Sequence, residues 1–354
     1  MTLETKKSVF VELGKFLKQF SENNTTKKSD VLHNDLFFDD FEKLIHLSQS
    51  HNGWYTPEQV YFALQSWGDA LTEENISKWL SDYSFDSAQD EKNVALILAG
   101  NIPLVGFHDF LSVLISGNNA IVKTSSNDQH LLPFLAKYII AVNPDFSDKI
   151  TFAEGKLENF DAVIATGSNN TARYFEYYFK DKPSIIRKNR NSVAVINGKE
   201  TKEQLEALGE DIFRYFGLGC RNVSKLFVPK GYVFDGFFEA IFKYQDVIHY
   251  EKYANNYDYN KAVFLMSNFK LLDNGFLTIK EDPSYASPIS SVFYEFYESR
   301  EDLEKRLEAD AEQIQCIVSA DSGKNNIPFG QTQNPQLWDY ADNVDTITFL
   351  LTTK

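Results

Sequence analysis

The sequence has 354 residues, 43% of them hydrophobic and 24% charged, a composition typical of a folded protein with about two compact domains. Its net charge of −15 and pI of about 4.9 argue against a nucleic-acid-binding protein, because such proteins normally present a basic surface. Two distant cysteines, six histidines without a metal-binding spacing, and the lack of a signal-peptide pattern or a membrane-length apolar run predict a cytoplasmic protein without a metal site.

Residues 1–90 are predicted to be helical. Thr56, followed by proline, and Thr72 each have the pattern that begins a helix. Near the N-terminus, apolar residues recur at helical spacing and form one stripe: Phe10, Leu13, Leu17 and Phe20. We expect this region to pack as a helical layer on the next domain, with contact to a substrate or partner as the alternative.

Residues 91–197 alternate short apolar runs with helical segments. This alternation predicts βαβ units and a parallel sheet, as in a Rossmann-like nucleotide-binding domain. The apolar runs are VALILAG (94–100), AIVK (120–123), ITFAEG (150–155), DAVIATG (161–167) and SVAVI (192–196).

Three of these runs end in residues suited to binding a nucleotide. Ligands of parallel sheets bind beyond the carboxyl ends of the strands, and a helix N-terminus after such an end favours an anion. No GxGxxG fingerprint is present, so a dinucleotide would have to be bound in another way. The candidates, in chain order, are Asn101, then Lys123, Ser125 and Ser126, then Gly167 and Ser168.

Residues 198–330 are predicted to form a second α/β domain. A helix over 201–216 leads into a small-residue loop, and strands are expected at 225–229, 292–297 and 316–319. In the final segment, 331–354, the run TITFLL (346–351) is predicted to be a strand. A bare apolar edge would aggregate, so we expect this strand to pair with another subunit in a homo-oligomer.

Cys220 lies in that small-residue loop, in GLGCRNVSK (217–225). A nucleophilic cysteine needs backbone amides and positive charge nearby, and Arg221 and Lys225 could lower its pKa. The alternative is a small buried residue in a tight turn. Cys316, among apolar neighbours, is expected to be a core residue.

Several basic side chains have two interpretations. Arg187, Lys188 and Arg190 form either a solvated face or a site for CoA or cofactor phosphates. His108 is either an ordinary residue near a helix start or a proton donor.

Four segments, in this order, resemble the aldehyde dehydrogenase superfamily. They are GNIPLVGFHDFLSVLISGNNAIVKTSSND (100–128), ATGSNNTARYF (165–175), GLGCRNVSKLFVP (217–229) and IPFGQTQNPQLWDYADNVDTITFL (327–350). Within the superfamily the sequence is most similar to the acyl-CoA reductase branch, which includes the reductase subunit of the bacterial bioluminescence fatty-acid reductase complex. The resemblance covers roughly residues 90–354 and leaves the helical start unexplained.

The resemblance implies an α/β, aldehyde-dehydrogenase-like fold with a Rossmann-like cofactor domain, an α/β catalytic domain and a helical N-terminal extension. The matching positions imply Cys220 as nucleophile and Asn101 as an oxyanion donor together with the Cys220 amide. The implied cofactor residues are Lys123, Ser125, Ser126, Gly167 and Ser168, and Phe329, which either frames the nicotinamide or only forms a turn.

Two glutamates that many aldehyde-oxidising relatives carry are missing. The first would fall near Arg187, and the second in residues 283–288, which read PSYASP. Hydrolysis of an acyl-enzyme needs a general base to activate water, whereas reduction of an acyl thioester does not. The sequence therefore predicts NAD(P)H-dependent reduction of an acyl thioester, such as a long-chain acyl-CoA, to an aldehyde.

The cofactor is expected to be NADPH, with NADH as the alternative. NAD-preferring relatives often place a glutamate where this sequence has Ser126, and that carboxylate would repel a 2′-phosphate. The acyl carrier, CoA or a protein, stays open. Two other functions also stay open: a hydrolytic aldehyde dehydrogenase, and a non-catalytic nucleotide-binding scaffold of the same fold.

Overall fold

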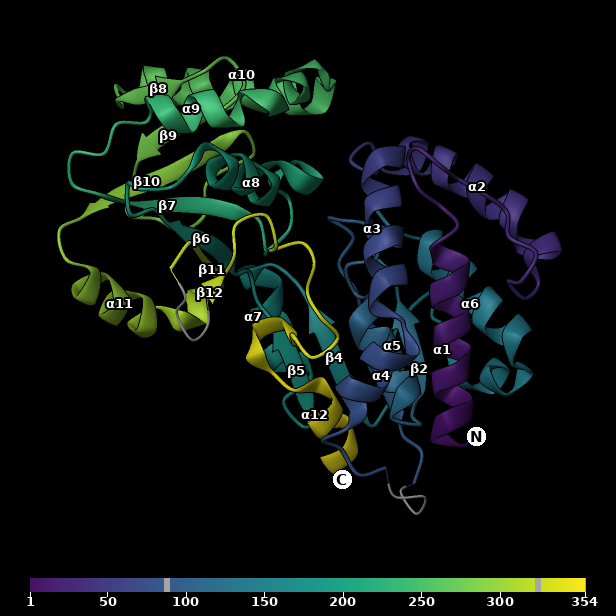
Figure 1. Ribbon diagram of the computed structural model, residues 1–354. Helices are drawn as coiled ribbons and strands as arrows, with labels where there is room; N and C mark the ends of the chain where they lie inside the picture. The colour runs from purple at the N-terminus through teal and green to yellow at the C-terminus, as the bar shows by residue number, and fades with distance from the viewer. Residues whose placement is uncertain (86–89, 322–325, 354) are drawn as a thin grey trace. The chain divides into compact units, whose positions relative to one another are not determined.

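The computed structural model describes residues 1–85, 90–321 and 326–353 (Figure 1). The chain divides into two compact units. Unit 1 comprises residues 1–188 and 336–354, and unit 2 comprises residues 189–335. Unit 2 is therefore inserted into the chain of unit 1.

Unit 1 contains a five-stranded parallel sheet with the order β3-β2-β1-β4-β5. The chain runs outward from β1 to β3 and then returns to place β4 on the other side of β1. This reversal is the point at which open α/β sheets bind ligands. The strands are β1 (Asn93–Ile97), β2 (Asn119–Lys123), β3 (Ile150–Phe152), β4 (Ala162–Thr166) and β5 (Ser184–Arg187).

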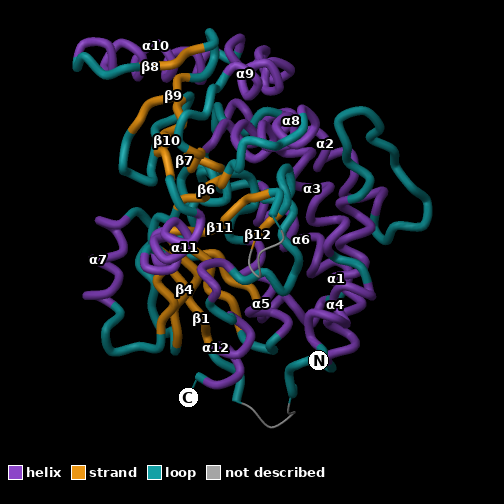
Figure 2. Tube along the Cα trace, turned by 60° about the vertical axis from the view of Figure 1, so that its left-hand side comes forward, coloured by secondary structure: helices purple, strands orange, loops and turns teal. Residues whose placement is uncertain are grey.

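Helices cover both faces of this sheet, as Figure 2 shows with α7 on one side of β1 and β4 and α1 and α4 on the other. Alternate residues of β1 therefore enter different cores: Val94 and Leu96 pack with the N-terminal helices, and Ala95 packs toward α7. The helices are α1 (Leu3–Leu17), α2 (Asn34–His51), α3 (Pro57–Ala70), α4 (Glu73–Leu80), α5 (Phe107–Ile115), α6 (Leu131–Val142), α7 (Asn169–Tyr178) and α12 (Thr346–Thr352), with short 3₁₀ turns at Pro144–Lys149 and Ala341–Asn343.

The predicted helical start is confirmed. The side chains of Thr56 and Thr72 cap α3 and α4 by accepting the amides of Gln59 and Asn75. The apolar stripe of α1 is fully buried, with no exposed surface at Phe10, Leu13, Leu17 or Phe20. Because these residues belong to the same core as β1 and β2, the N-terminal helices are part of unit 1 and not a separate extension.

Unit 2 contains a seven-stranded sheet with the order β12-β11-β6-β7-β10-β9-β8, parallel except where β8 pairs with β9. Its strands are β6 (Asn191–Val195), β7 (Val223–Pro229), β8 (Leu271–Asp273), β9 (Thr278–Glu281), β10 (Ser291–Tyr297), β11 (Ile314–Ser319) and β12 (Asn326–Ile327). Its helices are α8 (Lys202–Phe213), α9 (Asp235–Ile241), α10 (Glu251–Met266) and α11 (Arg300–Ala309), with 3₁₀ turns at Arg214–Gly217, Phe242–His249 and Ala311–Gln313.

The predicted boundary at residue 197 is displaced. The run SVAVI forms β6, which pairs with β7 and β11 in the sheet of unit 2. The boundary between the units therefore falls after Lys188. A buried parallel strand has the same apolar sequence in either sheet, so the pattern indicates a strand without indicating its neighbours.

The predicted C-terminal strand is wrong, because residues 346–352 form α12. The Asp345 side chain caps this helix by accepting the amide of Thr348 at 2.9 Å. Ile347 and Leu350, three residues apart, lie on one face and are buried in the core of unit 1. The argument for a homo-oligomer from an uncovered apolar strand therefore no longer applies.

No helix in the described parts of the chain is both long enough and apolar enough to cross a membrane. Over the same residues, no three histidine, cysteine or acidic side chains gather into a group that could hold a metal ion.

Candidate active site

The candidate residues fall into two sets, one in each unit. Asn101 and the residues of the second and third strand ends belong to unit 1, whereas Cys220 and Phe329 belong to unit 2.

In unit 1, parallel pairing brings the first two strand ends together. β1 pairs with β2 in register, with Ile97 opposite Lys123, so the loops that follow leave the sheet side by side. They touch at Gly100 and Ser125: a Cβ atom on Gly100 would lie 2.8 Å from the Cβ of Ser125, closer than two carbon atoms can approach. Glycine at position 100 therefore permits the turn that carries Asn101 to lie against the cofactor loop, residues 123–128.

The side chains of the cofactor loop have different roles. Lys123, Ser126 and Asn101 are exposed at the end of the sheet, where a ligand can reach them. Ser125 is half-buried and shapes the loop, because its hydroxyl accepts the amide of Asn127 at 3.2 Å and its carbonyl accepts the amide of Asp128 at 3.0 Å. The loops that carry Asn101 and the cofactor residues are thus neighbours, and the Ser125 side chain shapes the cofactor loop.

The third strand end, Gly167 and Ser168, begins helix α7. The Ser168 hydroxyl caps this helix by accepting the amide of Thr171 at 3.2 Å, and it also lies 2.9 Å from the Thr171 hydroxyl. The positive end of the helix dipole faces the turn, as binding of a pyrophosphate requires. The side chain of Ser168 is already used in capping, so the backbone of the turn is the part left for an anion.

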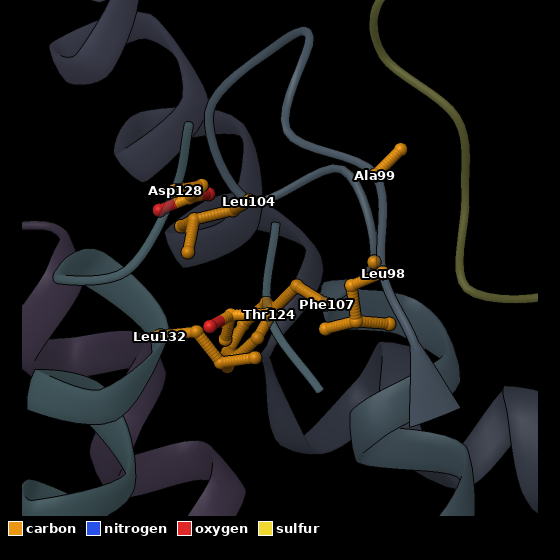
Figure 3. A pocket seen from close by; sticks show the side chains of 8 residues that line it. Leu98, Ala99, Leu104, Phe107, Thr124, Asp128 and Leu132 are labelled. Atoms are coloured by element: carbon orange, nitrogen blue, oxygen red, sulfur yellow. The ribbon is translucent and has the colours of Figure 1, made fainter. Parts of the chain in front are cut away.

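Beneath the Asn101 turn, unit 1 has a small, mostly apolar pocket (Figure 3). Its polar side chains are Thr124 and Asp128. Burial raises the pKa of Asp128 to about 6, although its carboxylate accepts hydrogen bonds from the amides of Leu104 and Leu131 and from the hydroxyl of Tyr55. The pocket is lined by Leu98, Ala99, Leu104, Gly106, Phe107, Thr124, Asp128 and Leu132.

In unit 2, Cys220 is exposed, which excludes the buried packing role. Its loop follows a turn in which Tyr215, Phe216 and Gly217 all have positive φ angles, of 53°, 57° and 76°. Two successive non-glycine residues in this region are unusual and strain the backbone. The surrounding structure must therefore hold the loop. Cys316, by contrast, is buried in β11 as predicted, with 4% of its surface exposed.

The side chain of Asn222 makes several of the hydrogen bonds that fix this loop. Its amide group donates to the carbonyl oxygens of Asp211 and Arg214 at 3.0 and 2.8 Å, and its oxygen accepts the amide of Gly219 at 2.8 Å. The carbonyl of Cys220 accepts the Ser192 hydroxyl at 3.0 Å. Asn222 was not singled out from the sequence, because an asparagine in a loop has no pattern that reveals its partners.

The two cations near Cys220 in sequence are engaged elsewhere. Lys225 has no exposed side-chain surface; its ammonium group lies 2.7 Å from the Glu295 carboxylate and donates to the carbonyl of Asp282. Burial lowers the pKa of Lys225. The guanidinium of Arg221 donates to the carbonyl of Thr332. The expectation that Lys225 supports a thiolate is therefore wrong, since its charge is compensated by Glu295.

The turn that contains Phe329 and Gly330 is fastened to the end of α8. The carboxylate of Asp211 accepts the amide of Gly330 at 2.6 Å and both the amide and hydroxyl of Thr332. Phe329 is buried, with 8% of its surface exposed. The helix that precedes the cysteine loop thus also positions this turn.

Neither interpretation of Arg187 is correct. It is buried and forms a two-pronged ion pair with Asp109 at 3.1 and 2.7 Å, while it also donates to the carbonyl of Ala341 at 2.8 Å. Burial alone would raise the pKa of Asp109, but the charge and hydrogen bonds of Arg187 hold it below its ordinary value. Lys188 pairs with Glu176 at 2.6 Å. Arg187 is therefore a structural anchor inside unit 1.

His108 is also a packing residue. Its ring lies near those of Trp79 and Tyr340, with centroids 5.3 and 5.4 Å away, and its Nε2 lies 2.8 Å from the carbonyl oxygen of Leu337. Burial lowers the pKa of His108, which favours the neutral ring. These contacts do not support the alternative of a proton donor.

A family model described as acyl-CoA reductase (LuxC) matches residues 69–239, slightly less than half of the chain. The chain is 24% identical over 232 residues to a long-chain acyl-protein thioester reductase of Vibrio harveyi, covering 56% of this chain and 47% of the relative. It is 24% identical over 168 residues to the enzyme of that name from Aliivibrio fischeri, covering 43% and 35%. The matches thus span less than half the length of these relatives.

Solved structures of aldehyde dehydrogenases have the same fold. Aldehyde dehydrogenase 21 from Physcomitrella patens, in complex with succinate, gives a TM-score of 0.64 at 13% identity and covers 91% of this chain and 78% of its own. An NAD⁺ complex of an aldehyde dehydrogenase from Bacillus cereus gives 0.61 at 13% identity, covering 96% and 83%. The predicted aldehyde-dehydrogenase-like fold and the resemblance to the acyl-CoA reductase branch are confirmed.

Proposed function

We propose that this protein, which has the aldehyde dehydrogenase fold and resembles acyl-CoA reductases, reduces an acyl thioester to an aldehyde with a nicotinamide cofactor. One observation carries the proposal: Cys220 is exposed on a loop whose backbone is held by Asn222 and Ser192. A fixed, accessible thiol suits a nucleophile that forms a covalent intermediate.

In the proposed reaction, the Cys220 thiolate attacks the carbonyl carbon of the thioester. The carbon–sulfur bond to the carrier then breaks, and the carrier leaves as a thiolate with the electron pair of that bond. By resemblance, Asn101 and the amide of Cys220 donate hydrogen bonds to the oxyanion. The acyl group, now on Cys220, accepts a hydride and a proton, and the resulting hemithioacetal releases the aldehyde and restores the thiol.

Apart from Phe329, the expected cofactor residues are in unit 1. Lys123 and Ser126 are exposed three residues apart in the chain, and Gly100 leaves room where a Cβ would collide with Ser125. The turn at Gly167 lies at a helix N-terminus. These features fit a nicotinamide dinucleotide, which would supply the hydride when bound; the lack of a carboxylate at Ser126 supports NADPH over NADH.

The surroundings of Arg187 support reduction over hydrolysis. By resemblance, the water-activating glutamate of oxidising relatives would fall near position 187, which has an arginine that is bound to Asp109. Without a base at that position, an acyl-enzyme is protected from water. The acyl donor is an acyl-CoA or, as the names of the relatives suggest, an acylated protein.

Intact-mass spectrometry tests the proposal. The protein is mixed with a long-chain acyl-CoA without cofactor, and NADPH is then added. We expect one acyl group on Cys220 that disappears as aldehyde forms, and no adduct on the Cys220→Ala variant. Cys316→Ala is the matched control and should be acylated as the wild type is.

Three results would contradict the proposal. Acylation of Cys316 would identify the wrong nucleophile, and reduction by Cys220→Ala would exclude a covalent route through this residue. Release of fatty acid in place of aldehyde would indicate a hydrolytic enzyme.

A further inference from the structure

The turn between α2 and α3, residues 52–55, contacts the chain on both sides of Asn101. The amide group of Asn52 donates to the carbonyl of Gly100 at 3.3 Å, and the hydroxyl of Tyr55 donates to the carbonyl of Ile102 at 2.8 Å. The carbonyls of the residues before and after Asn101 are thus both held by the N-terminal helical region. The four sequence segments that resemble known enzymes begin at residue 100 and do not include this region.

The orientation of the Asn52 side chain is fixed by its own turn. Its oxygen accepts the amide of Trp54 at 3.0 Å, so its nitrogen must face the other way, toward Gly100. The same nitrogen donates to the carbonyl of Asn127, in the cofactor loop, at 3.3 Å. Asn52 is buried, with 9% of its surface exposed. It therefore ties the Asn101 turn to the cofactor loop.

Tyr55 holds mainly the Asn101 side of this arrangement. Its side chain is 2% exposed, and its single hydroxyl proton has two acceptors in range, the carbonyl of Ile102 at 2.8 Å and the Asp128 carboxylate at 3.3 Å. The shorter contact is the stronger one. Tyr55 thus contributes a well-formed hydrogen bond to the residue next to Asn101.

Loop placement matters because a catalytic amide works only at the correct distance and angle from the oxyanion. A displacement of about 1 Å can reduce a rate by roughly two orders of magnitude. Asn101 is on an exposed turn, where its own side chain is not enclosed by a core. The hydrogen bonds to its neighbours' carbonyls therefore contribute to its position.

We propose that Asn52 and Tyr55 are positioning residues that orient Asn101 for oxyanion stabilisation, with Asn52 also coupling this turn to the cofactor loop. This inference rests on the proposed function. It assigns the N-terminal helical region a part in catalysis, through one turn that touches the site from outside the sheet.

Single-turnover acylation from acyl-CoA, measured by rapid quench, tests the role of Tyr55. Tyr55→Phe removes only the hydroxyl, and we expect acylation to slow by about tenfold while the Kd for NADPH changes less than in Asn52→Ala. Tyr138→Phe is the matched control: this buried tyrosine also donates to a backbone carbonyl, that of Leu32 at 3.0 Å, in the same unit. It should acylate at the wild-type rate.

Asn52→Ala should differ from Tyr55→Phe in one measurable respect. Because Asn52 also holds Asn127, its loss should both slow acylation and weaken NADPH binding by several-fold in a fluorescence titration. Unchanged NADPH binding in Asn52→Ala would contradict the coupling to the cofactor loop.

A double-mutant cycle separates positioning from general damage. In the Asn101→Ala background there is no amide left to orient, so adding Tyr55→Phe should not slow acylation further. Equal slowing in both backgrounds, or the same slowing in Tyr138→Phe, would overturn the positioning role. Absence of a Cys220 adduct in the wild-type protein would instead overturn the proposed function, and the positioning role with it.

Discussion

Thr332 donates two hydrogen bonds to one carboxylate oxygen of Asp211, from its amide at 3.0 Å and from its hydroxyl at 2.8 Å. The other oxygen of Asp211 accepts the amide of Gly330 at 2.6 Å. Asp211 itself is fully buried near the end of α8. Two segments more than a hundred residues apart in sequence, the cysteine loop and the Phe329 turn, thus depend on the same helix end.

Asp211→Asn should destabilise unit 2 by about 3 kcal/mol, measured by urea unfolding at pH 7. Asparagine has one acceptor atom where the carboxylate has two, so its NH₂ group would face a backbone amide and one hydrogen bond would be lost. Buried hydrogen bonds to a charged group contribute about 1.5–3 kcal/mol to stability. Thr332→Val, which removes only the hydroxyl, is the graded control and should lose about 1 kcal/mol. Equal losses from the two variants would show that the carboxylate has no special role.

Arg187→Met should destabilise unit 1 by about 3–5 kcal/mol, because it leaves the charge of Asp109 buried without a partner. Lys188→Met is the neighbouring control; its pair with Glu176 is about half exposed, so the loss should stay below about 1 kcal/mol. Adding Asp109→Leu to Arg187→Met should restore much of the stability, since no buried charge then remains. A raised KM for acyl-CoA in Arg187→Met without loss of stability would instead support phosphate binding.

Asp128 should make unit 1 less stable as the pH rises from about 4 to 6. Burial raises the pKa of its carboxyl from 3.8 to about 6, so in this range the folded protein keeps a proton that the unfolded chain has released. The shift corresponds to about 3 kcal/mol, lost progressively between the two pKa values and constant above pH 6.

Asp128→Asn removes this titration, so the wild-type protein should lose stability relative to the variant as the pH rises from 4 to 7. Asp30→Asn, at an exposed position, serves as control. Urea unfolding of both proteins at several pH values gives this difference in the free energy of unfolding. The contributions of all other titrating groups cancel in it, because both proteins share those groups. A difference that does not change with pH would contradict the burial of a charged carboxylate here.

Ser126→Glu should shift the cofactor preference toward NADH. The exposed position allows a carboxylate to approach the 2′-phosphate of NADPH, and repulsion at close range is worth about 1 kcal/mol or more, roughly tenfold in kcat/KM. Ser126→Gln, of similar size but without charge, should keep the preference for NADPH. A wild-type enzyme that uses NADH as well as NADPH would remove the basis of this prediction.

The parts of the fold that follow from local patterns could be predicted. Continuous apolar runs identified the buried strands, and Thr56 and Thr72 marked helix starts because a cap needs only its own next few residues. The proximity of the loops that carry Asn101 and Lys123 also followed, since adjacent parallel strands end at the same edge.

The features that depend on contacts with distant residues could not be predicted from the sequence. Arg187 looked like a member of a basic cluster, but its partner Asp109 is 78 residues earlier. Lys225 looked like a neighbour of Cys220, but a strand turns successive side chains to opposite faces and its partner Glu295 lies on β10. TITFLL suits a strand or a helix equally; the local signal for a helix, Asp345 as its N-cap, was overlooked in the sequence.

The insertion of unit 2 into unit 1 affects the order in which the protein can fold during synthesis. The core of unit 1 includes Leu337, Ile347 and Leu350, which the ribosome adds only after all of unit 2. Domains usually form in the order of their synthesis, N-terminal first. Here the chain of unit 2 is synthesised completely before that of unit 1. Part of the apolar surface of α1 and its neighbours therefore stays uncovered until residues 336–350 emerge. During translation, chaperones should therefore bind the N-terminal helices. They should be released when the C-terminal segment covers the exposed apolar surface.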